Sequence, residues 1–442
     1  MSNVRQVAVK VLGRIEKENA FAAAVMKVEL QVLTDERDAG LCTEIVLGVL
    51  RNRSWLDHLL LKASGREVLK LDPAVWNILR VAAYQLAWLS RVPDRAAVSE
   101  AVTHVGETGA ITLKGLANAI LRNIGRLAEE ARIPEALTLE TPAIQLALGS
   151  SVPLWIVSRM VADRGQESTL ATLSAFNQPS RRTLRVNLHL GDIGELAEKF
   201  PGLHRRDTLL PWSLQADGRA AARQLEEDGL AAYQDEGSGL VVAALSPATG
   251  DDILDACAGR GGKTGTIAML VGNSANITAC DKKSNKLDRL NFDLGRQKLR
   301  ANTQVMDLLK PFEGEMPLFD RVLLDAPCSG SGTIGRRPEI RWRLAESDVG
   351  ALIDIQAKML DAVASRVRPG GRLVFATCSV FAAEHTGHLA PFLKNHPDFH
   401  LVNTPPDIWP DLVDWNGGAP FINPGLTGTD GYGILCLTRK IC

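Results

Sequence analysis

The chain has 442 residues, of which 45% are hydrophobic and 23% are charged, and its formal net charge is −1. This length exceeds one ordinary core and predicts about two or three domains of a soluble globular protein. We expect no membrane span or signal peptide, and a near-neutral charge excludes a uniformly basic surface for nucleic acid.

The first part of the chain, residues 1–138, is predicted to form an all-α domain. Apolar residues recur there at helical spacing, and Gly and Pro are mostly confined to junctions. The expected helices are 4–15, 41–60, 73–89 and 95–105. The pattern loosens around residues 135–153, which marks a boundary.

Residues 139–228 are predicted to form a small α+β middle domain, with a strand at 183–188. From 229 to 442 strands and helices alternate. The expected strands are 253–256, 277–280, 321–324 and 373–376, and the expected helices include 282–298 and 352–367. This alternation predicts an α/β domain with a doubly wound, Rossmann-like, mostly parallel sheet that is covered on both faces.

A glycine-rich stretch, DILDACAGRGGKTG, follows the first of these strands and opens a helix. A Walker A loop is excluded because Cys257 stands where its first glycine belongs, and Thr264 breaks the dinucleotide fingerprint G-x-G-x-x-G. The pattern D-x-x-x-G-x-G, formed by Asp255, Gly259 and Gly261, is typical of S-adenosylmethionine methyltransferases. Its glycines let the backbone pass close to a cofactor. A tight turn without a ligand is the alternative interpretation.

Two further acids follow the next two predicted strands. Asp281 stands at a position suited to ribose hydroxyls, and Asp307 to an adenine amino group. Each of them taken alone fits a helix N-cap equally well.

Two cysteines fall just beyond predicted strand ends, in polar loops. Cys328 belongs to LLDAPCSGSG and Cys378 to VFATCSV, and Asp325 precedes the first of them. The carboxyl ends of parallel strands form ligand crevices, and a carboxylate there can accept hydrogen bonds from a planar nitrogen base. Burial is the alternative for any single cysteine, and we assign Cys42, Cys280, Cys436 and Cys442 to buried positions.

A thiol in such a crevice suits methylation of cytosine at carbon 5, which is a poor nucleophile. A thiolate that adds to carbon 6 makes carbon 5 reactive towards a methyl sulfonium. Because a free thiol has a pKa of about 8.5, the site needs a helix N-terminus or a cation such as Lys263. These residues alone do not rank the two cysteines. The seven scattered cysteines lack zinc-binding spacing, and they predict reduced thiols in a cytoplasmic protein without a metal.

The motifs DACAGRGGKT, DAPCSGSGTIGRRPEIRW and ATCSV resemble those of the Nop2/Sun group of RNA cytosine-C5 methyltransferases. The N-terminal third resembles the bacterial RsmB (Fmu/Sun) branch of this group, which carries a NusB-like RNA-binding domain. Its matching stretches are LCTEIVLGVLRNRSWLD, ILRVAAYQLAWLSRVPDRAAVSEAV and GLANAILRNI, and GTDGYG near the C-terminus also fits. The resemblance covers nearly the whole chain.

The resemblance implies a role for each site residue. Cys378 is the implied nucleophile, Cys328 assists release of the methylated RNA, and Asp325 contacts the base and the cofactor pocket. S-adenosylmethionine would be held by Cys257, Ala258, Gly259, Arg260, Gly261, Gly262, Lys263, Asp281, Asp307 and Asp325. The implied substrate is a cytosine of 16S rRNA, at the family's usual site 967, in naked RNA or an early assembly intermediate. We expect a monomer.

Two details depart from the family's pattern. Gly259-Arg260 replaces the usual Ala-Pro, and Ala382-Ala383-Glu384-His385 replaces Pro-Glu-Glu-Asn. Neither change touches a proposed catalytic atom.

RNA contacts are expected to be local, because the net charge is nearly zero. The candidates are Arg181, Arg182 and Arg185 on the middle domain, and Arg336, Arg337, Arg341 and Arg343 after the Cys328 loop; solvated faces are the alternative. A non-catalytic RNA-binding assembly or antitermination factor is the rival function, which the intact set of Asp325, Cys328 and Cys378 opposes. A Rossmann dehydrogenase is disfavoured by the missing third glycine.

Overall fold

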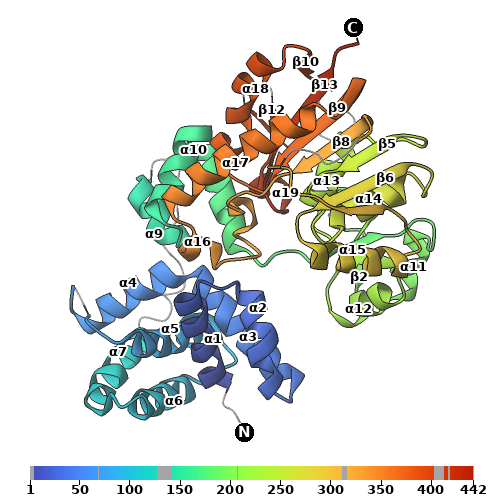
Figure 1. The fold of residues 1–442 in the computed structure, drawn as a ribbon. Coiled ribbons are helices and arrows are strands. Elements are labelled where there is room, and N and C mark those ends of the chain that lie inside the picture. The colour runs from blue at the N-terminus through green and yellow to red at the C-terminus, as the bar shows by residue number, and fades with distance from the viewer. Residues whose placement is uncertain are drawn as a thin grey trace. The chain divides into compact units, whose positions relative to one another are not determined.

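The computed structural model of the chain describes residues 4–67, 69–126, 141–206, 208–310, 316–402, 413–416 and 419–441. The chain divides into two compact units (Figure 1). The helical unit comprises Met1–Gln178 with Ile334–Leu344, and the sheet unit comprises Pro179–Thr333 with Ala345–Cys442. The predicted boundary after residue 138 lies outside the described residues, and the three-domain division stays a prediction. Among the described helices, none has the length and apolar character that crossing a bilayer requires.

The helical unit confirms the predicted all-α region. Its helices are α1 (Val4–Glu18), α2 (Ala22–Glu29), α3 (Glu36–Arg51), α4 (Arg53–Ser64), α5 (Pro73–Trp88), α6 (Asp94–Glu107), α7 (Lys114–Arg126), α9 (Ala143–Ser150), α10 (Leu154–Asn177) and α16 (Ile340–Arg343). The single helix predicted over 41–60 is wrong. Asn52 leaves the helical conformation, and its side-chain amide donates to the Gly48 carbonyl at 2.9 Å, so α3 ends and α4 begins there.

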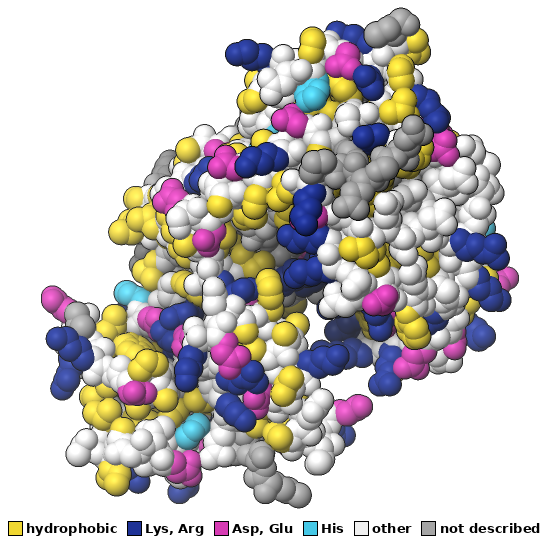
Figure 2. All heavy atoms as spheres, in the orientation of Figure 1, with side chains coloured by type: hydrophobic (Ala, Val, Ile, Leu, Met, Phe, Trp, Pro, Cys, Tyr) yellow, Lys and Arg dark blue, Asp and Glu magenta, His cyan; other side chains and the backbone are white. Residues whose placement is uncertain are grey.

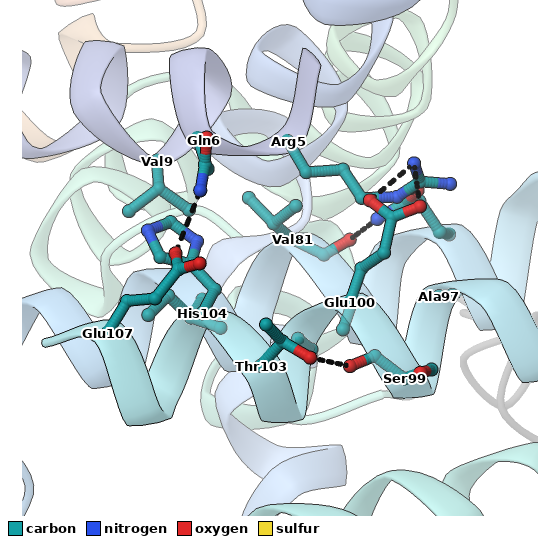
Figure 3. A pocket seen from close by; sticks show the side chains of 14 residues that line it. Arg5, Gln6, Val9, Val81, Ala97, Ser99, Glu100, Thr103, His104 and Glu107 are labelled. Carbon is teal, nitrogen blue, oxygen red and sulfur yellow. Dashed lines mark hydrogen bonds and ion pairs between the residues drawn. The ribbon is translucent and has the colours of Figure 1, made fainter. Parts of the chain in front are cut away.

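Helix α5 lies at the centre of this unit, and its residues from Ile78 to Ala87 are all buried. Close packing explains Gly48 on α3, because a Cβ there would lie 2.0 Å from the Tyr84 ring. Polar pairs join α1 to α5 and α6: Arg5 donates to Gln85 at 2.7 Å and to both oxygens of Glu100 (Figure 3). On the visible surface of this unit, Lys and Arg lie beside Asp and Glu (Figure 2), as the balanced composition requires.

The short helix α16 is anchored by Arg341, which is fully buried. Its guanidinium donates to the carbonyls of Arg51 at 2.7 Å, Ser150 at 2.9 Å and Phe176 at 2.8 Å. These carbonyls stand at the C-terminal ends of α3, α9 and α10, where backbone acceptors lack helical partners and a cation is favourable. The prediction that Arg341 contacts RNA is therefore wrong.

The sheet unit begins with a four-stranded antiparallel sheet in the order β2-β3-β1-β4. Its elements are β1 (Thr183–Val186), α11 (Ile193–Lys199), β2 (Leu203–His204), β3 (Ser213–Ala216), α12 (Ala220–Glu227) and β4 (Ala231–Tyr233). Arg185 on β1 is buried and donates to the Gln297 side-chain carbonyl at 2.6 Å. The prediction that it contacts RNA is wrong for the same reason as for Arg341.

The larger sheet confirms the Rossmann-like prediction. Its main path is β11-β12-β13-β9-β8-β5-β6-β7, and β10 pairs with β13. The parallel strands are β5 (Asp252–Asp255), β6 (Asn276–Asp281), β7 (Asn302–Val305), β8 (Phe319–Asp325) and β9 (Val367–Thr377). The antiparallel strands are β10 (Phe399–Leu401), β11 (Val413–Asn416), β12 (Ala419–Ile422) and β13 (Tyr432–Arg439).

Helices cover both faces of this sheet: α13 (Glu236–Leu245), α14 (Gly262–Leu270), α15 (Ser284–Arg296), α17 (Glu346–Ala364), α18 (Leu389–Asn395) and α19 (Pro424–Thr427) (Figure 1). Neighbouring residues of one strand point to opposite faces, so Leu323 shares a core with α13, α14 and α15, whereas Leu324 shares one with α17 and α18. The helix predicted over 352–367 ends at Ala364, because Val367 already begins β9.

The strand order reverses between β5 and β8. From β5 the chain moves outward through β6 and β7, and then returns to place β8 on the other side of β5. Ligands of doubly wound sheets bind outside the carboxyl ends of the strands at such a switch point. Both the glycine loop and the first cysteine loop start there.

Candidate functional site

The glycine loop connects the end of β5 to the start of α14. Gly259 and Gly261 adopt φ angles of 58° and 85°, a left-handed conformation that favours glycine. A Cβ on Gly261 would lie 2.6 Å from Leu290, so this residue packs the loop against α15. A Cβ on Gly262 would instead meet nothing within 4 Å, and one on Gly259 would meet only the Cys257 carbonyl oxygen at 4.0 Å. The loop therefore combines a packed side with a bare backbone surface that a ligand can approach.

Asp255, at the end of β5, is buried and incompletely paired. Its Oδ2 accepts from the Thr264 hydroxyl at 2.7 Å, whereas Oδ1 has no hydrogen-bond partner within the described ranges. Burial raises the pKa of this carboxyl to about 6. An orphaned buried acceptor fits a ligand that brings an N–H or O–H donor. S-adenosylmethionine carries both, so the residues present fit this cofactor.

Asp281 lies against the glycine loop. Its Oδ2 accepts from the Gly259 backbone at 3.2 Å and from Lys286 Nζ at 2.9 Å, and its Oδ1 accepts from the Lys283 backbone at 2.9 Å. Asp307 follows β7 and accepts from the Leu309 backbone at 3.1 Å, which closes a local turn. The structure thus joins Asp281 to the glycine loop, and shows Asp307 in a turn beyond the third parallel strand.

Lys263 and Asp325 form an ion pair that links the glycine loop to the end of β8. Lys263 Nζ lies 2.7 Å from Asp325 Oδ2 and 4.9 Å from the ring centroid of Tyr432 on β13. Burial lowers the pKa of Lys263, but Asp325, Tyr432 and Cys378 together outweigh it and raise this pKa above its ordinary value. The site therefore holds a permanent cation. Tyr432 is not recognisable as a site residue from the sequence, although the GTDGYG motif contains it.

The two cysteines predicted at strand ends lie together. Cys328 follows β8, Cys378 follows the adjacent strand β9, and their sulfur atoms are 3.4 Å apart. The hydrogen bond to Cys378, together with burial, raises the pKa of the Cys328 thiol well above its ordinary value. Cys328 is therefore held in its thiol form beside the Cys378 sulfur.

The remaining cysteines differ from this pair. Cys42, Cys280 and Cys436 are buried as predicted, and Cys442 lies outside the described residues. Burial raises the pKa of the Cys257 thiol in the glycine loop, which keeps it protonated.

Glu384 ties the two cysteine loops to each other. This fully buried carboxylate accepts from the Ser329 backbone at 2.9 Å, from the Ser379 hydroxyl at 2.6 Å and from Gln356 Nε2 at 3.0 Å. Ser329 and Ser379 each follow directly after one of the two cysteines. In the sequence, Glu384 is the one position of Ala382-Ala383-Glu384-His385 that matches the family's Pro-Glu-Glu-Asn. This match gave it no predicted role.

We expect Glu384→Gln to lower the turnover number for methyl transfer by up to about 10²-fold, because small misplacements of reacting groups cost this much. The amide has one acceptor oxygen where the carboxylate has two, so one of the three donors must turn away. Steady-state kinetics on RNA test this expectation. Glu198→Gln on α11, an exposed site, is the control. Equal turnover in both variants would contradict the positioning role.

The fold and the site define the class of this protein: an S-adenosylmethionine-dependent methyltransferase with a Rossmann-like sheet. A family model for the 16S rRNA methyltransferase RsmB/F matches residues 242–425, and the NusB family model matches residues 2–126. The "Probable ribosomal RNA small subunit methyltransferase B" of Bacillus subtilis is 32% identical, with 99% of each chain covered. The chain belongs to the ribosomal RNA small subunit methyltransferase B (RsmB) family.

A further relative agrees with this assignment, and a solved structure shares the fold. The ribosomal RNA small subunit methyltransferase B of Cronobacter sakazakii is 30% identical, again over 99% of both chains. The crystal structure of the protein PH0851 superposes with a TM-score of 0.77 over 99% of this chain and 98% of the other. Its sequence identity is 23%, so this likeness shows a shared fold.

Proposed function

We propose that this protein methylates carbon 5 of a cytosine in 16S rRNA, at site 967, through a covalent bond between Cys378 and carbon 6 of the base. The observation that carries this proposal is the 3.4 Å separation of two sulfur atoms at the ends of neighbouring parallel strands. Burial alone, the alternative interpretation of each cysteine, does not explain why two thiols from separate loops lie side by side in a polar crevice.

The protein's own groups suit the addition and release steps of this reaction. Cys378 adds to carbon 6, and the electron pair of the 5,6 double bond moves to carbon 5. The Cys328 sulfur lies 3.4 Å from the Cys378 sulfur, and the Lys263 cation interacts electrostatically with Cys378. After methylation a base removes the carbon-5 proton, the sulfur–carbon bond breaks, and Cys378 leaves as a thiolate. We assign Cys328 to assisting this release.

Asp325 is proposed to hold the base, since its carboxylate accepts hydrogen bonds and Lys263 keeps it oriented. S-adenosylmethionine, when bound, supplies the methyl group. We propose that residues 257–263 hold it with Asp281, Asp307 and Asp325, supported by the orphaned Asp255 oxygen and the bare backbone of Gly259 and Gly262. The target cytosine must be unpaired or extruded to reach a crevice at a sheet edge.

Incubation with tritiated S-adenosylmethionine and an unmodified 16S rRNA transcript tests the proposal. We expect label only in 5-methylcytidine, and bisulfite sequencing should locate it at one position. Label in another nucleoside would refute the carbon-5 assignment. Absence of label under conditions where the RNA binds would instead favour a non-catalytic RNA-binding assembly factor.

A further inference from the structure

A groove of about 1000 Å³ opens on the helical unit. It is lined by residues of α1, the start of α4, the first half of α5, and Trp342 and Arg343 at the end of α16. All of these belong to the same compact unit. The volume lies at the upper end of the range for small-molecule pockets, and so has room for more than one nucleotide.

Two tryptophans and two arginines give this groove stacking surfaces. The half-buried Trp76 has the Arg80 guanidinium 5.6 Å from its ring centroid, and the half-buried Trp342 has that of Arg53 at 5.2 Å. Planar aromatic rings and guanidinium groups are the side chains on which unpaired bases stack.

The groove carries a small excess of positive charge, which rests on Lys17 and Arg343. Five basic residues line it against two acids: Lys10, Lys17, Arg53, Arg80 and Arg343, opposed by Glu16 and Asp72. Glu16 pairs with both Arg53 and Arg80. Two acids outside the lining also pair with its bases, Asp57 with Arg80 and Glu29 with Lys10. Arg343 donates to the uncharged oxygens of Asn19 at 2.8 and 3.0 Å and lies 3.9 Å from the ring centroid of Phe21, contacts that do not neutralise its charge. The carboxylate of Glu339 is a nearby opposite charge.

A second pocket of the same unit shows the contrast. It holds about 120 Å³ between α1, α5 and α6, and its Arg5 faces Glu100 while Gln6 faces Glu107 (Figure 3). Its lining holds one arginine, two glutamates, two glutamines and a histidine among aliphatic, serine and threonine side chains, and it contains no tryptophan. Of these two pockets, only the larger groove combines excess positive charge with the faces of tryptophan rings.

The groove is also preorganised. Trp342 donates its indole N–H to the Leu50 carbonyl at 2.7 Å, and the neighbouring Arg341 fixes α16 to the ends of three helices. A rigid stacking surface binds a ligand with a smaller entropic cost than a mobile one.

We propose that this groove binds an unpaired segment of the substrate RNA, with bases stacked on Trp76 and Trp342 and phosphates near Lys17 and Arg343. This rests on the proposed function, because it takes RNA as the substrate. The side-chain chemistry favours a single strand over a duplex, since only unpaired bases expose their faces for stacking.

Binding of the full chain to a fluorescein-labelled single-stranded oligoribonucleotide, measured by anisotropy without S-adenosylmethionine, tests the inference. Trp76→Ala should weaken binding at least about fivefold, and Trp76→Phe should recover most of the loss. Lys17→Ala should reduce the slope of log affinity against log salt by about one. Lys27→Ala, an exposed lysine on α2, is the matched control.

Three outcomes would overturn the inference. The first is an RNA affinity that is unchanged in both Trp76→Ala and Lys17→Ala, and the second is a loss of affinity in Lys27→Ala as large as theirs. The third is a loss of affinity in Trp76→Ala for the oligoribonucleotide annealed to its complement that equals its loss for the single strand. Melting temperatures show whether Trp76→Ala folds, and the exposed Lys17 keeps the test valid if it does not. The inference can fail separately from the proposed function. Wild-type protein that binds RNA in this groove but transfers no methyl group refutes only the latter.

Discussion

Cys378→Ala is expected to abolish methyl transfer to 16S rRNA, a loss on the order of 10⁴-fold or more. Without the sulfur no covalent bond to carbon 6 forms, and carbon 5 stays a poor nucleophile. Cys328 lies 3.4 Å away but is not expected to substitute, because burial still raises the pKa of its thiol after the hydrogen bond to Cys378 is lost. Tritium transfer from S-adenosylmethionine measures the loss, and a denaturing gel with labelled RNA should show no protein–RNA adduct.

The control for this variant is Cys42→Ala, which removes a buried thiol from the helical unit. Transfer by this protein should stay close to wild type once folding is verified by its melting temperature. If Cys378→Ala kept substantial activity, the covalent mechanism assigned to this residue would be refuted.

Cys328→Ala should behave in the opposite manner and accumulate an adduct. The nucleophile still attacks and the base is still methylated, but release of Cys378 from the product is impaired. In the presence of S-adenosylmethionine we expect a denaturant-resistant protein–RNA complex, visible on a gel, together with a strong reduction of multiple turnover.

The double variant Cys328→Ala/Cys378→Ala is the decisive companion to this experiment, because its adduct should disappear. An adduct that forms in Cys378→Ala and is absent from Cys328→Ala would mean that the two cysteines exchange roles. Absence of an adduct from both single variants would argue against covalent catalysis altogether.

Local patterns predicted the elements that position the site. The strands at 253–256 and 321–324 are short apolar runs bounded by polar residues. Such runs predict β5 and β8 without knowledge of contacts to distant residues. The glycine loop was recognisable for a similar reason, since Gly259 and Gly261 satisfy a backbone requirement within a few residues.

The rest depends on contacts between distant parts of the chain. Arg341 looks like a surface cation in sequence, and its burial depends on carbonyls 165 to 290 positions away. Glu384 accepts from Ser329 across 55 positions and from Gln356 across 28. Charge and periodicity do not reveal partners this far apart in the sequence. Arg341 was therefore predicted to contact RNA, and Glu384 was given no predicted role.

The detour of Ile334–Leu344 into the helical unit has a consequence for how the protein is made. This segment belongs to the unit that contains the first 178 residues, yet ribosomes synthesise it only after β8 and the Cys328 loop. Until then, the carbonyls at the ends of α3, α9 and α10 lack their cation. The N-terminal region therefore acquires its final packing late in translation, and a gene fragment that encodes it alone would produce a loosened bundle.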